Sequence, residues 1–192
     1  MEKKIILCSG SPRRQELLKL LVPSFEIRKS DADETFLCGN PEKFAVELAK
    51  RKAKAVWEKL DAGGREKAIL ISADTSVWLN DREFGKPSDK SEAFEMIRSL
   101  SGRAHAVVTG VCVMSHDREV CFAEKTIVHV LPMSTEEIEA YVSTPEPYDK
   151  AGGYGIQGAF SRYISGIEGD YFNVVGLPVS HLWQALKQFG IS

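Results

Sequence analysis

The order of the apolar segments constrains the fold of this chain more than any other feature. Short strand-like segments, beginning at residues 4–8, alternate with helix-like segments over the first half of the chain. Two long strand-like segments, 104–114 and 119–131, then follow one another with only a short turn between them, as in a hairpin. Alternation of strands with helices favours parallel pairing of the strands, whereas the two strands of a hairpin pair antiparallel. The sequence therefore predicts an α/β protein with a mixed sheet.

Local signals place the other elements. Ser11 and Pro12 suit the N-cap and the first position of a helix, and Ser134-Thr135-Glu136-Glu137 is a capping box. We predict helices at residues 15–21, 40–60, 88–100 and 134–142, and a last helix that ends at Gly190. We predict further strands at 25–29, 68–73, 163–167 and 171–175, a hairpin at 78–84, and loops at 61–65 and 145–158.

The composition is that of an ordinary folded protein and excludes some classes of partner. The net charge of −2 leaves no general excess of positive charge to bind a nucleic acid. The apolar runs are far shorter than the roughly 18 residues of a membrane span. The charged start of the chain precedes too few apolar residues for a signal peptide. We therefore expect a cytoplasmic protein that binds neither nucleic acid nor a membrane.

The cysteines and histidines give no metal pattern. Cys8, Cys38, Cys112 and Cys121 form no C-x-x-C pair and have no histidine at metal-ligand spacing, so we expect free thiols. In the predicted hairpin, Cys112 and Cys121 lie opposite each other on the two strands. That proximity allows contact but does not by itself predict a disulfide. The four histidines are expected to have structural roles.

The segment Ser9-Gly10-Ser11-Pro12-Arg13-Arg14 indicates a phosphate site. It places two arginines in the first turn of a helix, where positive side chains oppose the helix dipole. Structure alone gives no reason to put them there, although two solvated arginines on an exposed helix are the alternative. An anion would be bound by free backbone N–H groups, by the hydroxyls of Ser9 and Ser11, and by the guanidinium groups of Arg13 and Arg14.

Two acidic residues fit the same chemistry. Asp74 follows the apolar run at 68–73, at the strand end where active-site residues of α/β folds emerge, although it also suits a turn. Glu34 lies in an acidic segment after the predicted strand at 25–29, and such segments are usually solvated surface. In a triphosphate hydrolase, carboxylates hold a divalent metal or take a proton from water. Glu34 and Asp74 are therefore the candidate metal ligands.

Two nucleotide-binding motifs are matched only in part. Gly85-Lys86-Pro87 has Asn80 where a phosphate-binding loop needs glycine and Pro87 where it needs Ser or Thr. Residues 153–158 match G-x-G-x-x-G, but no apolar strand precedes them and no obvious helix follows. These glycines more simply let the backbone approach a ligand closely. Lys52 and Lys86 remain candidate phosphate contacts as point charges.

Six segments in register carry a resemblance that no single one carries. They are SGSPRRQELL (9–18), SADTSV (72–77), GKP (85–87), LSGRAHAVVTGV (100–111), EPYDKAGGYGIQG (146–158) and NVVGLP (173–178). Together they resemble the Maf family of nucleotide pyrophosphatases, from near the first residue to near the last. The resemblance implies one domain of two lobes, a fold like that of the inosine triphosphate pyrophosphatases, and a nucleotide bound in a central cleft.

The resemblance also implies an activity and a set of site residues. The expected reaction cleaves a nucleoside triphosphate between its α- and β-phosphates, giving a monophosphate and pyrophosphate. Asp74 matches the catalytic proton acceptor, and Glu34 helps it to place water and a divalent metal, Mg²⁺ or Mn²⁺. The positions that set substrate choice are matched by Arg13, Thr75 and Gln157. The remaining polar positions of the cleft are matched by Glu34, Lys52 and Lys86.

Gln157 and the segment before it resemble the branch of the family that acts on dTTP and UTP. The branch that acts on 7-methyl-GTP typically carries Glu at this position. An amide offers a donor and an acceptor, which suit the O4 and N3–H edge of thymine or uracil, whereas a carboxylate has no donor. Such a site rejects the wrong edge by a factor of about 10⁴. Residues 158–163 depart from the family pattern, and this run is about one residue shorter.

Two other functions stay open at this point. The family name is tied to inhibition of septum formation, so one alternative is a nucleotide-sensing regulator that does not need turnover. The other is a house-cleaning pyrophosphatase for damaged purine nucleotides. A homodimer is expected from the resemblance alone.

Overall fold

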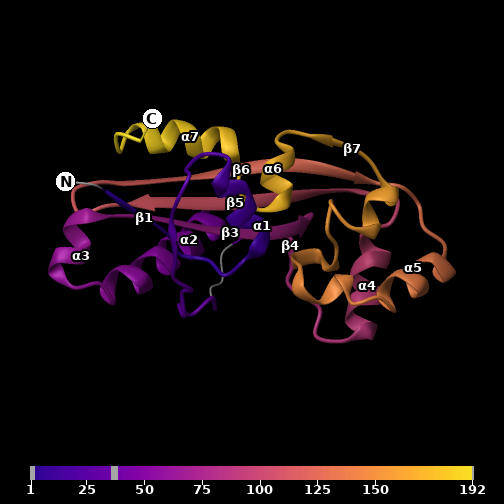
Figure 1. Cartoon of the computed structure of the whole chain (residues 1–192). Coiled ribbons are helices and arrows are strands. Elements are labelled where there is room, and N and C mark those ends of the chain that lie inside the picture. Colours follow the sequence, from indigo (N-terminus) through magenta and orange to yellow (C-terminus); the bar gives the residue numbers. More distant parts are fainter. Residues whose placement is uncertain (1–2, 36–38, 192) are drawn as a thin grey trace. The chain divides into compact units, whose positions relative to one another are not determined.

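The computed structural model describes residues 3–35 and 39–191, a range that leaves out Cys38. Within it the strands form a seven-stranded mixed sheet in the order β2-β1-β3-β5-β6-β7, with β4 paired to β3 (Figure 1). The strands are β1 (Lys4–Leu7), β2 (Glu26–Ile27), β3 (Ala68–Leu79), β4 (Arg82–Phe84), β5 (Ala104–Met114), β6 (Glu119–Val130) and β7 (Ile164–Glu168). The helices are α1 (Pro12–Lys19), α2 (Pro41–Glu58), α3 (Ala62–Lys67), α4 (Lys90–Leu100), α5 (Thr135–Val142), η1 (Glu146–Asp149), η2 (Ala151–Gly153), η3 (Ala159–Tyr163), α6 (Tyr171–Val175) and α7 (Val179–Lys187). The predicted α/β class with a mixed sheet is confirmed.

The chain divides into two compact units. Unit 1 consists of Met1–Asp74, Thr109–Glu124 and Gly176–Ser192, and unit 2 of Thr75–Val108 and Lys125–Val175. Strands β3, β5 and β6 each supply residues to both units. None of the helices in the described part of the chain combines the length and the hydrophobicity that a membrane span requires.

In unit 1, parallel strands are covered by helices. β1 pairs in parallel with both β2 and β3. The side chain of Asn40 caps α2 by accepting the Lys43 N–H, and Pro41 takes the first helical position. The apolar face of α2 then packs on the sheet, with Ala49 and Ala53 against β5. In Figure 1, α2 and α7 lie on opposite faces of these strands.

Unit 2 has its own core. Residues of β3, β5 and β6 pack there against α4 and α5, with Ile97 of α4 and Ile138 of α5 both buried. The predicted capping box of α5 is present, because Ser134 and Glu137 each accept the other's backbone N–H. The predicted hairpin at 78–84 is β3–β4, with Asn80 in the left-handed region (φ 54°) at its turn.

Strand β3 is longer than predicted. The sequence indicated a strand that ends at Ala73, because Asp74, Thr75 and Ser76 are polar, but the strand runs on to Leu79. The buried Ser76 hydroxyl donates to the carbonyl of Val108 and accepts the indole N–H of Trp78. These bonds let polar residues continue inside a buried strand. Asp74 therefore lies within β3 and not at its end.

Two other predictions were wrong because local capping decides the structure. Residues 62–65 of the loop predicted at 61–65 belong to α3, which Asp61 caps by accepting the Gly64 N–H at its Oδ1 at 2.6 Å. The strand predicted at 171–175 is α6, where Asp170 Oδ1 accepts the Phe172 N–H at 2.8 Å. The glycines of α3 and the aromatic and β-branched residues of α6 concealed these helices. The loop predicted at 145–158 contains the short helices η1 and η2.

Helix α2 approaches β5 at a single glycine. A Cβ atom placed on Gly110 would overlap the carbonyl group of Ala45 and the amide nitrogen of Val46. Gly110 is buried, and the obstructing atoms are backbone, which cannot rotate away. The distance between α2 and this part of the sheet therefore depends on the absence of a side chain at position 110.

We expect Gly110→Ala to lower the free energy of unfolding by about 1–3 kcal/mol, because α2 must shift to admit the methyl group. The matched control is Gly63→Ala in α3, where an added Cβ meets nothing within 4 Å. Alanine there is expected to be neutral or stabilising by up to about 1 kcal/mol. Urea denaturation measures both changes. Equal midpoints for Gly110→Ala and the wild type would contradict the packing argument.

Unit 2 buries a histidine in its neutral form. His105 Nε2 lies 2.6 Å from the Tyr154 hydroxyl, and both side chains are buried. Burial lowers the pKa of His105 to about 4, and the charge of His129 lowers it further in the same direction. Burial raises the pKa of Tyr154, so its hydroxyl keeps its proton.

This pair makes stability depend on pH. The ordinary pKa of histidine is 6.5 and that of folded His105 is about 4, so between these values the unfolded chain binds a proton that the folded chain does not. Stability therefore falls as the pH drops from 6.5 towards 4, by about 2 kcal/mol at pH 5. We expect His105→Phe to remove this part of the dependence and His116→Asn, in an exposed turn, to leave it intact. Identical pH profiles for the wild type and His105→Phe would refute the prediction.

Candidate active site

The start of α1 is built around two serine hydroxyls. Ser11 is the N-cap, and its Oγ accepts the Arg14 N–H at 3.5 Å. Ser9 Oγ accepts the Ser11 N–H at 3.2 Å and an Arg14 Nη1 proton at 3.3 Å. The Ser11 cap and Pro12 at the first helical position are as predicted, although α1 spans Pro12–Lys19 and not the predicted 15–21. The two serines orient this turn and Arg14 together.

Arg14 is fixed by a segment from the far end of the chain. Its Nε donates to the carbonyl of Gly176 at 2.9 Å. Burial is the main influence on the pKa of Arg14 and lowers it. The negative charge of Asp74 opposes this shift, the positive charge of Arg13 adds to it, and the negative charge of Glu34 opposes it. The charges of Asp74, Arg13 and Glu34 therefore all act on the Arg14 guanidinium group.

Lys52 joins the two acidic residues. Its Nζ lies 2.5 Å from Asp74 Oδ1 and 2.9 Å from Glu34 Oε1. The side chains of Lys52 and Asp74 are only 13% and 12% exposed, whereas that of Glu34 is 60% exposed. The three residues come from α2, from β3 and from the segment after β2. Unit 1 therefore brings a nearly buried carboxylate, an exposed carboxylate and an ammonium group to one point.

Ser72 sets the register of this group and was not found from the sequence. Its hydroxyl donates to the Ala49 carbonyl at 2.6 Å and lies 3.3 Å from the Cys112 carbonyl. Ala49 precedes Lys52 by three residues on α2, and Ser72 precedes Asp74 by two on β3, so each pair shares a face. The available signal was a lone hydroxyl inside the most apolar run of the chain.

The donor atoms in this group suit a hard divalent cation. Mg²⁺ is commonly held by one or two carboxylates together with substrate phosphates, and Asp74 and Glu34 offer two carboxylates that converge on the same cation, here the Lys52 ammonium. The residues thus fit the predicted metal. A separate cluster in the described residues brings three possible metal-ligand atoms together. It consists of Cys112, Glu119 and Cys121 and does not include Asp74 or Glu34.

The other predicted site residues belong to unit 2. Thr75 follows Asp74 on β3 and is half-buried, and Lys86, just after β4, and Gln157, between η2 and η3, are exposed. No hydrogen bond joins Lys86 to Gln157 within the residues that the structure describes. The Gly152 N–H donates to the Gly85 carbonyl at 2.9 Å, which ties the segment before Gln157 to the residue before Lys86.

Glu146 anchors the segment that follows Gln157, a role that the sequence did not reveal. One carboxylate oxygen accepts the Ala159 N–H at 2.8 Å, and the other accepts the Tyr141 hydroxyl at 3.1 Å and the Phe160 N–H at 3.4 Å. Phe160 is fully buried in the core of unit 2. The run after Gln157 that departs from the family pattern is thus held at both its backbone and its side chains.

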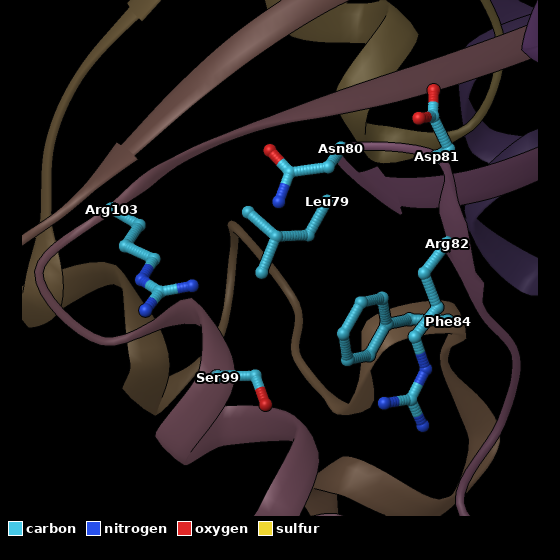
Figure 2. A pocket seen from close by; sticks show the side chains of 7 residues that line it. All are labelled: Leu79, Asn80, Asp81, Arg82, Phe84, Ser99 and Arg103. Carbon is cyan, nitrogen blue, oxygen red and sulfur yellow. The ribbon is translucent and has the colours of Figure 1, made fainter.

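Unit 2 also contains a cavity of about 500 Å³ that lies apart from the predicted residues (Figure 2). Arg103 and Arg82 extend into it from opposite sides, with Leu79 and Phe84 between them. It is lined by Leu79, Asn80, Asp81, Arg82, Phe84, Ser99 and Arg103. None of the site residues predicted from the sequence lines this cavity.

Comparison with known proteins agrees with the resemblance seen in the motifs. The chain is 48% identical over 190 residues to a protein of Bacillus anthracis named dTTP/UTP pyrophosphatase, covering 98% of this chain and 97% of that protein. It is 47% identical to a Bacillus cereus protein of the same name, covering 98% of this chain and 91% of that one. A solved structure, the Ham1 protein of Staphylococcus aureus, aligns with a TM-score of 0.48 and 15% identity over 67% of this chain and 72% of that one. The family model described as Maf-like protein matches residues 4–189, and the chain therefore belongs to the Maf family.

Proposed function

We propose that this protein hydrolyses dTTP and UTP to the nucleoside monophosphate and pyrophosphate. The observation that carries the proposal is the contact of Lys52 with both Asp74 and Glu34, beside the two arginines of α1. The names of the relatives at 47–48% identity, which cover nearly the whole chain, supply the reaction and the substrates.

Asp74 is the proposed proton acceptor for the attacking water. It is nearly buried, so solvent competes little for its oxygens, and the Lys52 ammonium keeps one of them oriented. Glu34 is more exposed and is proposed to position the water and the substrate with it. Both acids therefore act from unit 1.

Positive charge near these acids is proposed to offset the charge that builds on the leaving pyrophosphate. Arg14 is already held in place by Ser9 and by the Gly176 carbonyl, so little of its freedom remains to be lost on binding. Ser11 and the start of α1 are proposed to bind phosphate oxygens, with Arg13 beside them. Lys86 and Thr75, from unit 2, are proposed to contribute contacts of the kind that the family resemblance implies.

A divalent metal, Mg²⁺ or Mn²⁺, is proposed to bind Asp74 and Glu34 together with the substrate phosphates. When bound, such an ion polarises phosphoryl oxygens and neutralises part of their charge. Because Lys52 contacts the same two carboxylates, its ammonium group is proposed to keep them converged when no ion is bound.

We expect Asp74→Asn to lower turnover of dTTP by about 10²–10⁴-fold, since the amide cannot accept the proton from water. The circular dichroism spectrum is expected to stay native. Asp117→Asn, in the exposed turn between β5 and β6, is the matched control and is expected to keep wild-type turnover. A folded Asp74→Asn variant with near-native turnover would exclude Asp74 as the base.

We expect Gln157→Glu to lower kcat/KM for dTTP and UTP by about 10–100-fold, because the carboxylate has no donor for the O4 of the base and leaves it unpaired. Gln184→Glu, on the exposed face of α7, makes the same chemical change away from the proposed site. Steady-state kinetics with each triphosphate measure both variants. An unchanged nucleotide preference would show that Gln157 does not select the base.

A panel of nucleoside triphosphates, with and without a chelator, tests the function itself through pyrophosphate release. Hydrolysis of dTTP and UTP that is lost with the chelator supports both the reaction and the metal. Binding of nucleotides without release would instead indicate a nucleotide-sensing regulator, and a preference for modified purine triphosphates would indicate the house-cleaning activity. The homodimer and the cytoplasmic location remain predictions from the sequence.

A further inference from the structure

Two cysteines face each other near the tip of the β5–β6 hairpin. The Sγ atoms of Cys112 and Cys121 are 2.7 Å apart. The Ser115 N–H donates to the Arg118 carbonyl at 2.8 Å, which fixes the turn and the pairing of residues behind it. Residues 115 and 118 pair at the turn, so three residues further along each strand Cys112 and Cys121 lie directly opposite each other. Counted from the turn, theirs is a position at which the opposed residues exchange no backbone hydrogen bonds, the class in which side chains lie closest. Their contact is therefore set by the register of the hairpin.

The two sulfur atoms have different surroundings. Cys112 is fully buried and packs against Ala49 and Ala53 of α2, whereas Cys121 is half-buried. The hydrogen bond with Cys121 raises the pKa of Cys112, and burial raises it further, so Cys112 keeps its proton. Cys121 is thus the sulfur that a small molecule from solvent reaches first, with Cys112 directly behind it.

A charged pair lies beside the accessible sulfur. Lys50 Nζ is 3.0 Å from Glu119 Oε1. The Glu119 carboxylate raises the pKa of Lys50, and the charge of a Cys121 thiolate raises it in the same direction. The Lys50 ammonium group therefore stays charged beside this cluster.

The same residues fit a metal site less well. Ligand atoms of Cys112, Glu119 and Cys121 lie within 4.8 Å of one another. Two thiolates on one zinc ion, with bonds of about 2.3 Å and tetrahedral angles, are roughly 3.8 Å apart, well beyond the observed 2.7 Å. The carboxylate that would complete the site is bound to Lys50.

We propose that Cys112 and Cys121 are a site of reversible oxidation, at which a peroxide converts the two thiols into a disulfide. The Cys121 thiolate attacks one peroxide oxygen, breaks the O–O bond and becomes a sulfenic acid, while the other oxygen leaves and is protonated. Cys112 Sγ then attacks the Cys121 sulfur, and its proton leaves with the hydroxyl group as water. The two thiols lose two electrons and two protons, which reduce hydrogen peroxide to two waters.

The test treats the reduced, folded full-length protein with hydrogen peroxide, blocks remaining thiols and maps peptides without reduction. We expect the thiols counted in denaturant to fall from four to two, with a peptide that links Cys112 to Cys121 and a loss of two hydrogen atoms. A reducing agent is expected to restore all four. Cys121→Ser and Cys112→Ser are each expected to lose the linked peptide. Cys112 is buried and Cys121 is half-buried, so if Cys112→Ser impairs folding, Cys121→Ser still tests the proposal in a folded protein.

Cys8 provides the matched control. It is buried, and burial raises its pKa to about 12, so Cys8→Ser should leave the Cys112–Cys121 linkage unchanged. The proposal is overturned if all four thiols persist at a peroxide concentration that oxidises free cysteine in the same buffer. It is also overturned if the linkage joins other cysteines, or if the purified protein holds stoichiometric zinc that both serine variants lose.

Discussion

The contact of Lys52 with Asp74 is the interaction on which the candidate site depends. Both side chains are nearly buried, so each charge would be costly to hold without the other. Helix α2 supplies the cation and strand β3 the anion. Their pairing therefore requires α2 to lie at one position along β3 and at one distance from the sheet. The exposed Glu34 adds a second carboxylate to the same ammonium group without this burial.

Two residues outside the site fix this position of α2 and its distance from the sheet. Gly110 lets the backbone of α2 come into contact with β5, and the Ser72 hydroxyl joins the Ala49 carbonyl to β3. Neither residue has a charge or an obvious chemical role. They act as spacers, and they show why a polar or small residue inside an apolar strand can matter as much as the charged pair that it positions.

Much of the fold was predictable because its signals are local. The capped start of α1 at Ser11 and Pro12, the capping box of α5 and the hairpin turn at Asn80 were all identified from short runs of residues. The sequence missed the local caps of α3 and α6, and it failed at β3 because a partner distant in the chain decides the outcome. Polar Asp74 and Ser76 suggested the end of a strand, but bonds such as that from Ser76 to the Val108 carbonyl keep β3 going.

The candidate site follows the same rule. Arg14 and Asp74 were identified from motifs and Lys52 from the family resemblance, whereas their grouping depends on contacts that no motif contains, such as that of Arg14 with Gly176. Glu146 was missed for this reason as well, since its partners Ala159 and Phe160 lie more than ten residues further along the chain.

The composition of unit 1 has a consequence for how the protein is made. Its segments come from the beginning, the middle and the end of the chain, and Arg14 gains its carbonyl partner only when Gly176 is available. During synthesis on a ribosome, the Arg14 Nε group must therefore wait for Gly176 to emerge before it gains this carbonyl partner. Nascent chains of this protein expose an incomplete unit 1 until the segment that begins at Gly176 has emerged.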